Sequence, residues 1–336
     1  MQKIEFGSTG LVIEKNGFGC LPIQRISETE AVKLLHKACD GGINFFDTAR
    51  AYSDSEQKVG AAFSGMRDRI VLATKTGAQT AEGFWRDLET SLRTLKTDYI
   101  DIYQFHNPAF CPKPGGDDGL YDAALEAKKQ GKIRHISITN HRLTVAHEAI
   151  DSGLYETLQF PFSYLAGEQE LELVRKCREK DMGFIAMKGM AGGLIRDGFT
   201  AAAWMAQQEG VVPIWGVQRE QELDQFLQCI REGAELTPER QERIERDRKE
   251  LCGEFCRGCG YCMPCPVGIE INQCARMSLM LRRAPAKEWL TEQWQQKMHR
   301  IEECRHCGHC TSKCPYGLNT PELLQANYKD YWQVLA

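Results

Sequence analysis

Short apolar runs alternate with amphipathic stretches from residue 17 to about residue 230. The apolar runs have the length and side-chain content of strands, and the stretches between them have helical spacing. The predicted strands, some with the start of the following loop, cover residues 17–23, 43–52, 69–77, 99–107, 133–141, 158–165, 183–190 and 211–218. Eight strand–helix units with short connections favour an α/β fold, a closed (β/α)8 TIM barrel, over an open sheet. Residues 4–14 predict a hairpin that we expect to plug the bottom of the barrel.

Local signals support the first helix of this alternation. Ser27 and Glu30 form a capping box, in which each side chain satisfies a backbone N–H of the other residue. Val32, Leu35 and Cys39 then recur at a spacing that places them on one helical face. A pair of glycines ends the predicted helix.

The pattern changes after residue 233. Residues 239–251 are mostly charged, and they follow Thr237 as the predicted N-cap and Pro238 at the first helical position. Beyond them, helix-like pieces lie between runs of cysteine. We therefore predict two domains: the barrel at residues 1–233, and a connecting helix with a mostly helical domain at residues 234–336.

The overall composition argues against several classes of partner. Of the 336 residues, 42% are hydrophobic and 26% are charged, which is ordinary for a globular chain. A net charge of −4 gives no support for a nucleic-acid or membrane-surface partner. No apolar run reaches the ~20 residues of a membrane-spanning helix. The N-terminus lacks a signal pattern, so we predict a cytoplasmic protein.

Cysteine is abundant and unevenly distributed. Five of the 15 cysteines are scattered through the barrel region, and we expect them to be small buried residues. The other ten lie between Cys252 and Cys314. In a reducing cytoplasm, such crowding favours bound metal over disulfides.

Eight of these cysteines form two regularly spaced runs. The first run is Cys256, Cys259, Cys262 and Cys265, and the second is Cys304, Cys307, Cys310 and Cys314. Three thiolates on a tight loop can reach three corners of a cubane, so the fourth corner must be filled from elsewhere. The runs resemble the bacterial two-cluster ferredoxin pattern, in which the last cysteine of each run serves the other cluster.

This resemblance implies two [4Fe-4S] clusters in a ferredoxin-like domain. One cluster is assigned to Cys256, Cys259, Cys262 and Cys314, and the other to Cys304, Cys307, Cys310 and Cys265. Two structural zinc sites are the alternative, although zinc prefers two Cys-x-x-Cys pairs per site. Cys252 and Cys274 fall outside both patterns and are expected to be bystanders.

Four polar residues follow the ends of three successive predicted strands. Because such strand ends converge on one face of a barrel, Asp47, Tyr52, Lys75 and His106 are expected to meet in one pocket. In a carbonyl reduction Tyr52 would donate the proton, and the Lys75 ammonium would lower the pKa of the phenol. Asp47 would hold Lys75 charged, and His106 would orient the substrate oxygen.

Each of these residues also has an ordinary structural interpretation. An aspartate after a strand often caps the next helix, and a tyrosine there can pack with its hydroxyl in water. A lone histidine is more often structural than catalytic, and a lysine at a strand end is usually a surface charge. The joint placement on adjacent strands is what favours a shared catalytic site.

The motifs FDTARAY, ATKTG and FHNP resemble those of the aldo-keto reductase family, in the same order. The resemblance covers about residues 1–233 and implies that Asp47, Tyr52, Lys75 and His106 are the catalytic tetrad, with Tyr52 as general acid. The tail resembles the ferredoxin extension of a bacterial subgroup of that family. The implied activity is NAD(P)-dependent interconversion of a small-molecule carbonyl and an alcohol.

The resemblance also implies a site for a nicotinamide nucleotide. Its residues in this chain would be Thr139, Asn140, Gln159, Gly216, Gln218, Arg219 and Gln225. Thr139, Asn140 and Gln159 would bind the nicotinamide carboxamide. Glu222 stands where NADPH-preferring relatives carry an arginine, and a carboxylate would repel the 2′-phosphate. Arg219 is a nearby substitute, so the choice between NADH and NADPH stays open.

Two redox systems in one chain leave several functions open. A nicotinamide moves two electrons as a hydride, whereas each iron-sulfur cluster moves one electron. The clusters are then either structural or connected through a flavin or an electron-transfer partner protein. One alternative is an electron-transfer or redox-sensing protein whose barrel binds a ligand but turns it over slowly. Another is an isomerase or lyase that oxidises its substrate transiently. The complete tetrad favours an enzyme over an electron-transfer or redox-sensing protein, and the oxidoreductase is the leading hypothesis.

Overall fold

The chain divides into two compact units. The computed structural model describes residues 3–251, 255–283 and 286–335. The first unit comprises Met1–Gly189 and Gly198–Gln241, and the second comprises Met190–Asp197 and Glu242–Ala336. The short segment at residues 190–197 therefore belongs with the C-terminal part of the chain, although it interrupts the first unit in the sequence.

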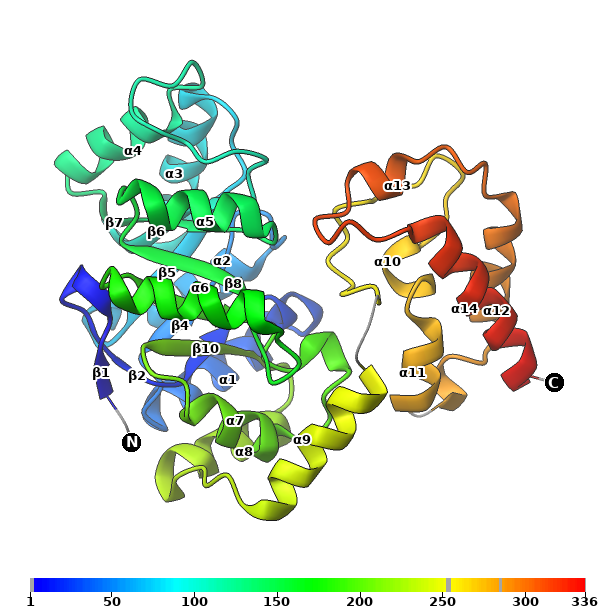
Figure 1. Ribbon diagram of the computed structural model, residues 1–336. Coiled ribbons are helices and arrows are strands. Elements are labelled where there is room, and N and C mark those ends of the chain that lie inside the picture. Colours follow the sequence, from blue (N-terminus) through cyan, green and yellow to red (C-terminus); the bar gives the residue numbers. More distant parts are fainter. Residues whose placement is uncertain (1–2, 252–254, 284–285, 336) are drawn as a thin grey trace. The chain divides into compact units, whose positions relative to one another are not determined.

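Parallel strands close into an eight-stranded barrel in the first unit, as the alternation predicts (Figure 1). They are β3 (Gly17–Gly19), β4 (Phe45–Asp47), β5 (Val71–Thr76), β6 (Ile100–His106), β7 (Ile133–Thr139), β8 (Thr157–Pro161), β9 (Gly183–Met187) and β10 (Val211–Gly216). Each strand pairs with the next, and β10 pairs with β3 to close the ring. The strand predicted at residues 17–23 ends at Gly19, because Pro22 cannot extend the ladder and opens the 3-10 turn η2 (Pro22–Arg25).

Helices alternate with these strands. They are α1 (Glu28–Asp40), α2 (Ser55–Phe63), α3 (Ala81–Leu95), α4 (Leu120–Lys129), α5 (Leu143–Ser152), α6 (Glu168–Glu179), α7 (Gly198–Ala206) and α8 (Glu220–Glu232), with the short turns η3 (Arg67–Arg69) and η4 (Ala191–Gly193). The predicted capping box of α1 is confirmed. The N–H of Glu30 donates to Ser27 Oγ (3.3 Å), and the N–H of Ser27 donates to Glu30 Oε2 (2.9 Å).

The buried face of α1 differs slightly from the predicted one. Its buried residues are Ala31, Leu34, Leu35 and Ala38. Val32 and Cys39 are only partly buried and lie at the edges of this face. Two alanines thus take the central positions, since a small side chain allows a helix to lie close to the barrel.

The N-terminal hairpin covers one end of the barrel. It consists of β1 (Lys3–Glu5) and β2 (Val12–Glu14), which pair antiparallel around the turn η1 (Gly7–Thr9). Phe6 and Ile13 are fully buried and pack with strand residues that include Phe45, Ile102 and Ile185. Because Phe45 and Ile102 lie in the first halves of their strands, the hairpin fills the end opposite the predicted active site, and the expected plug is observed.

The second unit is helical around its cysteine loops. It contains most of α9 (Pro238–Leu251), then α10 (Ile271–Cys274), α11 (Met277–Arg283), η5 (Ala286–Glu288), α12 (Glu292–His299), η6 (Arg300–Glu303), α13 (His309–Ser312) and α14 (Thr320–Leu335). Thr237 caps α9 as predicted, because its Oγ1 accepts from the N–H of Arg240 (3.4 Å). Asn327 on α14 joins two helices by accepting from the N–H of Ser278 (2.8 Å) and donating to the carbonyl of Ala275 (3.2 Å). No helix among the described residues has both the length and the apolar character needed to cross a bilayer.

Candidate active site and cysteine cavities

A buried ion pair lies at the carboxyl ends of β4 and β5. Lys75 Nζ is 2.5 Å from Asp47 Oδ2 and donates a second hydrogen bond to the carbonyl of Thr48 (2.7 Å). Only 1% of Lys75 and 2% of Asp47 is exposed. Burial raises the pKa of Asp47 and lowers the pKa of Lys75, while the attraction between the two charges opposes both shifts.

Two glutamines complete the surroundings of Asp47. Gln104 Nε2 donates to Asp47 Oδ1 (2.8 Å), and the side chain of Gln159 also hydrogen-bonds this carboxylate. Both glutamines are almost fully buried. Sequence reasoning missed Gln104, although one signal was present: it is a polar residue in the apolar strand β6, two positions before His106 and therefore on the same face.

Tyr52 and His106 meet beside this ion pair. Their rings contact edge to face, with centroids 5.9 Å apart, and Lys75 Nζ lies 5.3 Å from the centre of the Tyr52 ring. Burial lowers the pKa of His106 to about 3, with the Lys75 charge adding to the shift, so the imidazole is neutral at physiological pH. The structure thus brings all four residues of the predicted tetrad together.

The expectation that Lys75 lowers the pKa of Tyr52 is wrong for this arrangement. Burial raises the pKa of Tyr52, and the negative charge of Asp47 raises it further. Lys75 is paired with the Asp47 carboxylate. The negative charge of Asp47 therefore offsets the effect of the Lys75 charge on the phenol. Tyr52 therefore carries its proton at neutral pH.

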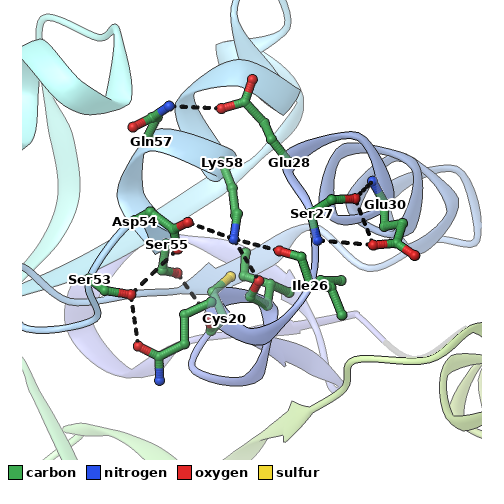
Figure 2. A network of polar contacts seen from close by, with 12 residues as sticks. Cys20, Ile26, Ser27, Glu28, Glu30, Ser53, Asp54, Ser55, Gln57 and Lys58 are labelled. Carbon is green, nitrogen blue, oxygen red and sulfur yellow. Dashed lines mark hydrogen bonds and ion pairs between the residues drawn. The ribbon is translucent and has the colours of Figure 1, made fainter.

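A buried lysine on α2 links the loop that carries Tyr52 to the loop that follows β3 (Figure 2). Lys58 Nζ donates to the carbonyls of Ile23 (3.1 Å) and Ile26 (2.7 Å) and forms an ion pair with Asp54 (2.8 Å). The two carbonyls belong to the loop after β3, and Asp54 follows Tyr52 by two positions. One side chain thus ties the loops that follow two adjacent strands.

Hydroxyl groups strengthen the same junction. Ser55 Oγ donates to the carbonyl of Cys20 (2.9 Å) and contacts Thr48 Oγ1 (2.9 Å), while Ser53 Oγ donates to Gln24 Oε1 (3.0 Å) (Figure 2). Cys20 itself is fully buried beside Asp47 and Lys75, and burial raises the pKa of its thiol well above the usual value. It is thus a protonated packing residue at the site, as expected for the scattered cysteines.

The residues predicted to bind nicotinamide lie at the ends of β7 and β8. Thr139 and Gln159 face each other across these strands, and both are buried. The buried oxygen Gln159 Oε1 has no hydrogen-bond partner among the residues that the structure describes. Asn140, by contrast, is engaged at both ends of its amide: Nδ2 donates to the carbonyl of Pro108 (2.8 Å), and Oδ1 accepts from the N–H groups of His141 and Arg142.

The remaining residues of the predicted nucleotide site lie between the end of β10 and the second turn of α8. Glu222 Oε2 accepts from the N–H groups of Gln218 (3.0 Å) and Arg219 (3.2 Å), and its Oε1 pairs with the Arg219 guanidinium (2.6 Å). Gly216 and Gln225 are exposed, and Gln218 Oε1 is buried without a partner. The carboxylate of Glu222 therefore occupies the helix N-terminus and neutralises the nearest arginine.

The cysteines of the two runs surround two cavities in the second unit. One cavity, of about 140 Å³, is lined by Cys265, Cys304, Cys307 and Cys310. The other, of about 10 Å³, is lined by Cys256, Cys259, Cys262 and Cys314. Each cavity combines three cysteines of one run with the last cysteine of the other. Cys274 is buried in α10 and lines neither cavity, and Cys252 lies outside the described residues.

Comparison with known proteins agrees with this geometry. The profile of the Aldo/keto reductase family matches residues 4–201, which is more than half of the chain. The chain belongs to the aldo/keto reductase family. It is an oxidoreductase that acts on carbonyl or alcohol groups. The profile of a 4Fe-4S dicluster domain matches residues 255–319, which contain both cysteine runs.

Curated relatives within the family are oxidoreductases. The uncharacterized oxidoreductase YqkF of Bacillus subtilis is 30% identical over 211 residues, which cover 59% of this chain and 67% of that protein. The L-galactose dehydrogenase of Arabidopsis thaliana is 30% identical over 223 residues, which cover 59% of this chain and 69% of that protein.

Solved structures of the family share the barrel. The aldo-keto reductase AKR11C1 from Bacillus halodurans, in its holo form, matches with a TM-score of 0.66 and 25% identity over 76% of this chain and 99% of that chain. An aldo/keto reductase from Klebsiella pneumoniae, in complex with NADP and acetate, matches with a TM-score of 0.62 and 25% identity over 73% of this chain and 94% of that chain.

Proposed function

We propose that the barrel interconverts a small-molecule carbonyl and an alcohol at Asp47, Tyr52, Lys75 and His106, and that the second unit holds two [4Fe-4S] clusters for electron transfer. A bound nicotinamide nucleotide would supply or accept the hydride. The observation that carries the proposal is the buried Asp47–Lys75 ion pair, which lies against the ring of Tyr52. A buried charge pair is costly to form and weak evidence for stability alone, so its placement at a barrel mouth favours a catalytic role.

Tyr52 is the proton donor in this proposal. Its raised pKa keeps the phenol protonated at neutral pH, and the proton passes to the carbonyl oxygen when the substrate is reduced. The Lys75 ammonium lies 5.3 Å from the centre of the Tyr52 ring. Asp47 holds this ammonium in place, and Gln104 holds Asp47.

His106 orients the substrate oxygen. Because its pKa is about 3, the imidazole is neutral and offers one ring N–H as a hydrogen-bond donor. A neutral donor does not compete with Tyr52 as a proton source. The edge-to-face contact between the two rings keeps both groups at the same point of the pocket.

The side chains at β8 fit a nicotinamide. Gln159 Oε1 is a buried acceptor without a partner, which suits the amino group of a carboxamide. Thr139 lies beside it on β7. The amide of Asn140 already binds the protein at both ends, so its predicted contact with the nucleotide requires one of these bonds to be exchanged.

We further propose that NADH is preferred to NADPH. A 2′-phosphate at the start of α8 would meet the Glu222 carboxylate, which already accepts two backbone N–H bonds there. Arg219 is paired with the same carboxylate and is not available as an unopposed cation. The Klebsiella pneumoniae relative is the one in complex with NADP, so this preference would be a departure of the present chain.

The cysteine cavities support the cluster assignment. A cubane needs four sulfur ligands around a space, and each cavity has four cysteines on its wall. Cys307, on the wall of the larger cavity, is exposed. It offers a route for electrons to an external partner protein. We therefore propose that electrons enter or leave through this second unit.

An anaerobic titration of the iron-reconstituted full chain with NADH, and separately with NADPH, tests the proposal. Visible absorbance and EPR would follow the clusters while iron and sulfide are counted. We expect about eight iron atoms per chain, the content of two clusters, and tighter binding of NADH. Gln159→Leu should weaken nucleotide binding, whereas Gln207→Leu, at an exposed position, should not.

The results separate this proposal from a second candidate. The chain would instead be an electron-transfer or redox-sensing protein with a weakly catalytic barrel, a reading favoured by the engaged side chains of Asn140 and Arg219. Loaded clusters without binding of either nucleotide would support that candidate. Nucleotide binding with little iron would leave the hydride chemistry and contradict the two clusters.

A further inference from the structure

Arg276 is a buried cation in the second unit, and it has no acidic partner among the described residues. It lies between α10 and α11 and is 6% exposed. Its Nη2 donates to the carbonyl of Gly192 (2.7 Å) and contacts Met280 Sδ (3.3 Å), whereas Nε has no hydrogen-bond partner in the described part of the chain. No ion pair between described residues includes Arg276. A buried charge of this kind is strongly unfavourable unless an opposite charge lies nearby.

Two glycine turns make room for the guanidinium. A Cβ atom on Gly258 would lie 2.6 Å from Arg276 Nη1, and one on Gly192 would lie 2.9 Å from it. Both glycines have positive φ, +65° and +66°, so they are turns that other residues rarely adopt. The guanidinium therefore lies in a space that only glycine at both positions leaves open.

One of these turns belongs to a cysteine run. Gly258 stands between Cys256 and Cys259, and its N–H donates to Cys256 Sγ (3.4 Å). The guanidinium is therefore next to the loop that lines the smaller cavity. Burial lowers the pKa of Arg276, and the charge of Cys256 opposes this shift only in part. Arginine stays protonated in proteins, so the charge persists.

We propose that Arg276 is the counter-charge of the cluster held by Cys256, Cys259, Cys262 and Cys314, and that it raises the reduction potential of this cluster. The inference rests on the two-cluster assignment proposed above. Four thiolates make such a site negative, and each one-electron reduction adds a further negative charge. A fixed positive charge in a poorly hydrated environment favours the reduced state, since little water screens it.

The other cysteine cavity provides the contrast. Arg305 lines it, but both Arg305 and Cys307 are exposed, so water and salt screen the charge of this arginine. Cys256 and Cys262 are buried at the Arg276 side. A change of charge at residue 276 should therefore affect one cluster, and the same change at residue 305 should have a much smaller effect on either.

Redox potentiometry of the full chain tests the proposal. Dithionite is the reductant, EPR follows each cluster separately, and iron is counted in every variant. Arg276→Gln should make one cluster about tenfold harder to reduce, which is about 59 mV for a one-electron couple, and leave the other midpoint unchanged. Arg276→Lys, which keeps the charge, should shift that midpoint by less than half as much. Arg305→Gln is the matched control and should shift both midpoints little.

The possible outcomes distinguish the role of Arg276 from the two-cluster assignment. Two clusters whose midpoints are both unchanged in Arg276→Gln would overturn the role of Arg276 and leave the clusters in place. Equal shifts in Arg276→Gln and Arg276→Lys would also overturn it, because geometry rather than charge would then be responsible. If Arg276→Gln loses its iron, Arg276→Lys decides: a midpoint close to wild type supports the proposal, and a large shift overturns it. Fewer than about eight iron atoms in the wild-type chain would instead contradict the two-cluster assignment.

Discussion

The polar residues of the barrel mouth depend on one another for their ionisation states. Asp47 and Lys75 are buried as a pair, and removing either one would leave an uncompensated buried charge at a cost of about 3–5 kcal/mol. Substitutions at these two positions therefore combine effects on stability and on chemistry. Tyr52 and His106 are partly exposed and carry no net charge at neutral pH, so variants at these positions report the chemistry more directly.

Tyr52→Phe should remove turnover while leaving the fold intact. The variant keeps the ring that contacts His106 and Lys75 and loses only the hydroxyl that donates the proton. We expect kcat/KM to fall by about 10²–10⁴, the usual contribution of a general acid, with unchanged iron content. Tyr99→Phe, at a tyrosine between Arg67 and Arg134, is the control and should retain activity. Full turnover by Tyr52→Phe in anaerobic steady-state assays would contradict the proposed mechanism.

The low pKa of His106 should make the protein less stable in mild acid. In the unfolded chain a histidine binds its proton near pH 6.5, whereas folded His106 binds it only near pH 3. The stability contributed by the neutral imidazole is thus complete above about pH 6.5 and is lost as the pH falls toward 3.

Urea unfolding at pH 7.5 and 5.5 measures this effect. Between these values His106 should contribute a loss of about 1.4 kcal/mol, and His106→Gln should show a pH dependence smaller by that amount. His306→Gln, at an exposed histidine, is the matched control. An identical pH dependence in wild type and His106→Gln would mean that His106 titrates normally in the folded protein.

Among the elements of the barrel, α2 holds the loops after β3 and β4 together. Its Lys58 side chain is 4% exposed and binds two carbonyls of one loop and a carboxylate of the other. The loop after β4 includes Tyr52, so the position of the proton donor depends on a contact that is not itself part of the chemistry.

Lys58→Met should destabilise the fold by about 1–3 kcal/mol, because one buried and one partly buried carbonyl lose their donor. Lys33→Met is the matched control on α1. The Lys33 side chain is 76% exposed, and its 3.0 Å ion pair with Glu220 should contribute less than about 1 kcal/mol. The free energy of unfolding in urea measures both changes. Equal effects of the two variants would show that the Lys58 contacts add nothing to stability.

At the scale of the whole molecule, two cysteine runs far apart in the sequence close each other's cavities. Cys265 lines the cavity of the second run, and Cys314 lines the cavity of the first. Each cavity takes its fourth cysteine from the other run, so each proposed cluster joins the two halves of the second unit. Formation of the clusters and folding of this unit are therefore expected to be coupled.

Paired cysteine substitutions test this crossed arrangement by counting iron. Cys265→Ser with Cys307→Ser affects a single cavity, so about four iron atoms per chain should remain. Cys265→Ser with Cys259→Ser affects both cavities and should leave little iron. The reverse result would mean that each run holds its own cluster.

Local patterns predicted much of this molecule. The strand positions, the capping box at Ser27 and the cap at Thr237 were readable, because each depends on side chains only a few residues apart. The burial of α1 was less predictable. Ala31 and Ala38 take its central positions, and the choice between small and large side chains depends on how close the neighbouring element lies.

The order of strands and helices, the family and the spacing of the cysteines could be predicted from the chain alone, since these follow from periodicity and short motifs. Which distant groups share an environment depends on the fold. Gln104 and Asp47 are 57 positions apart in the chain, and Arg276 and Gly192 are 84 apart, yet each pair is hydrogen-bonded. The pKa of Tyr52 was decided in the same way, because burial and neighbouring charges arise only when the chain has folded.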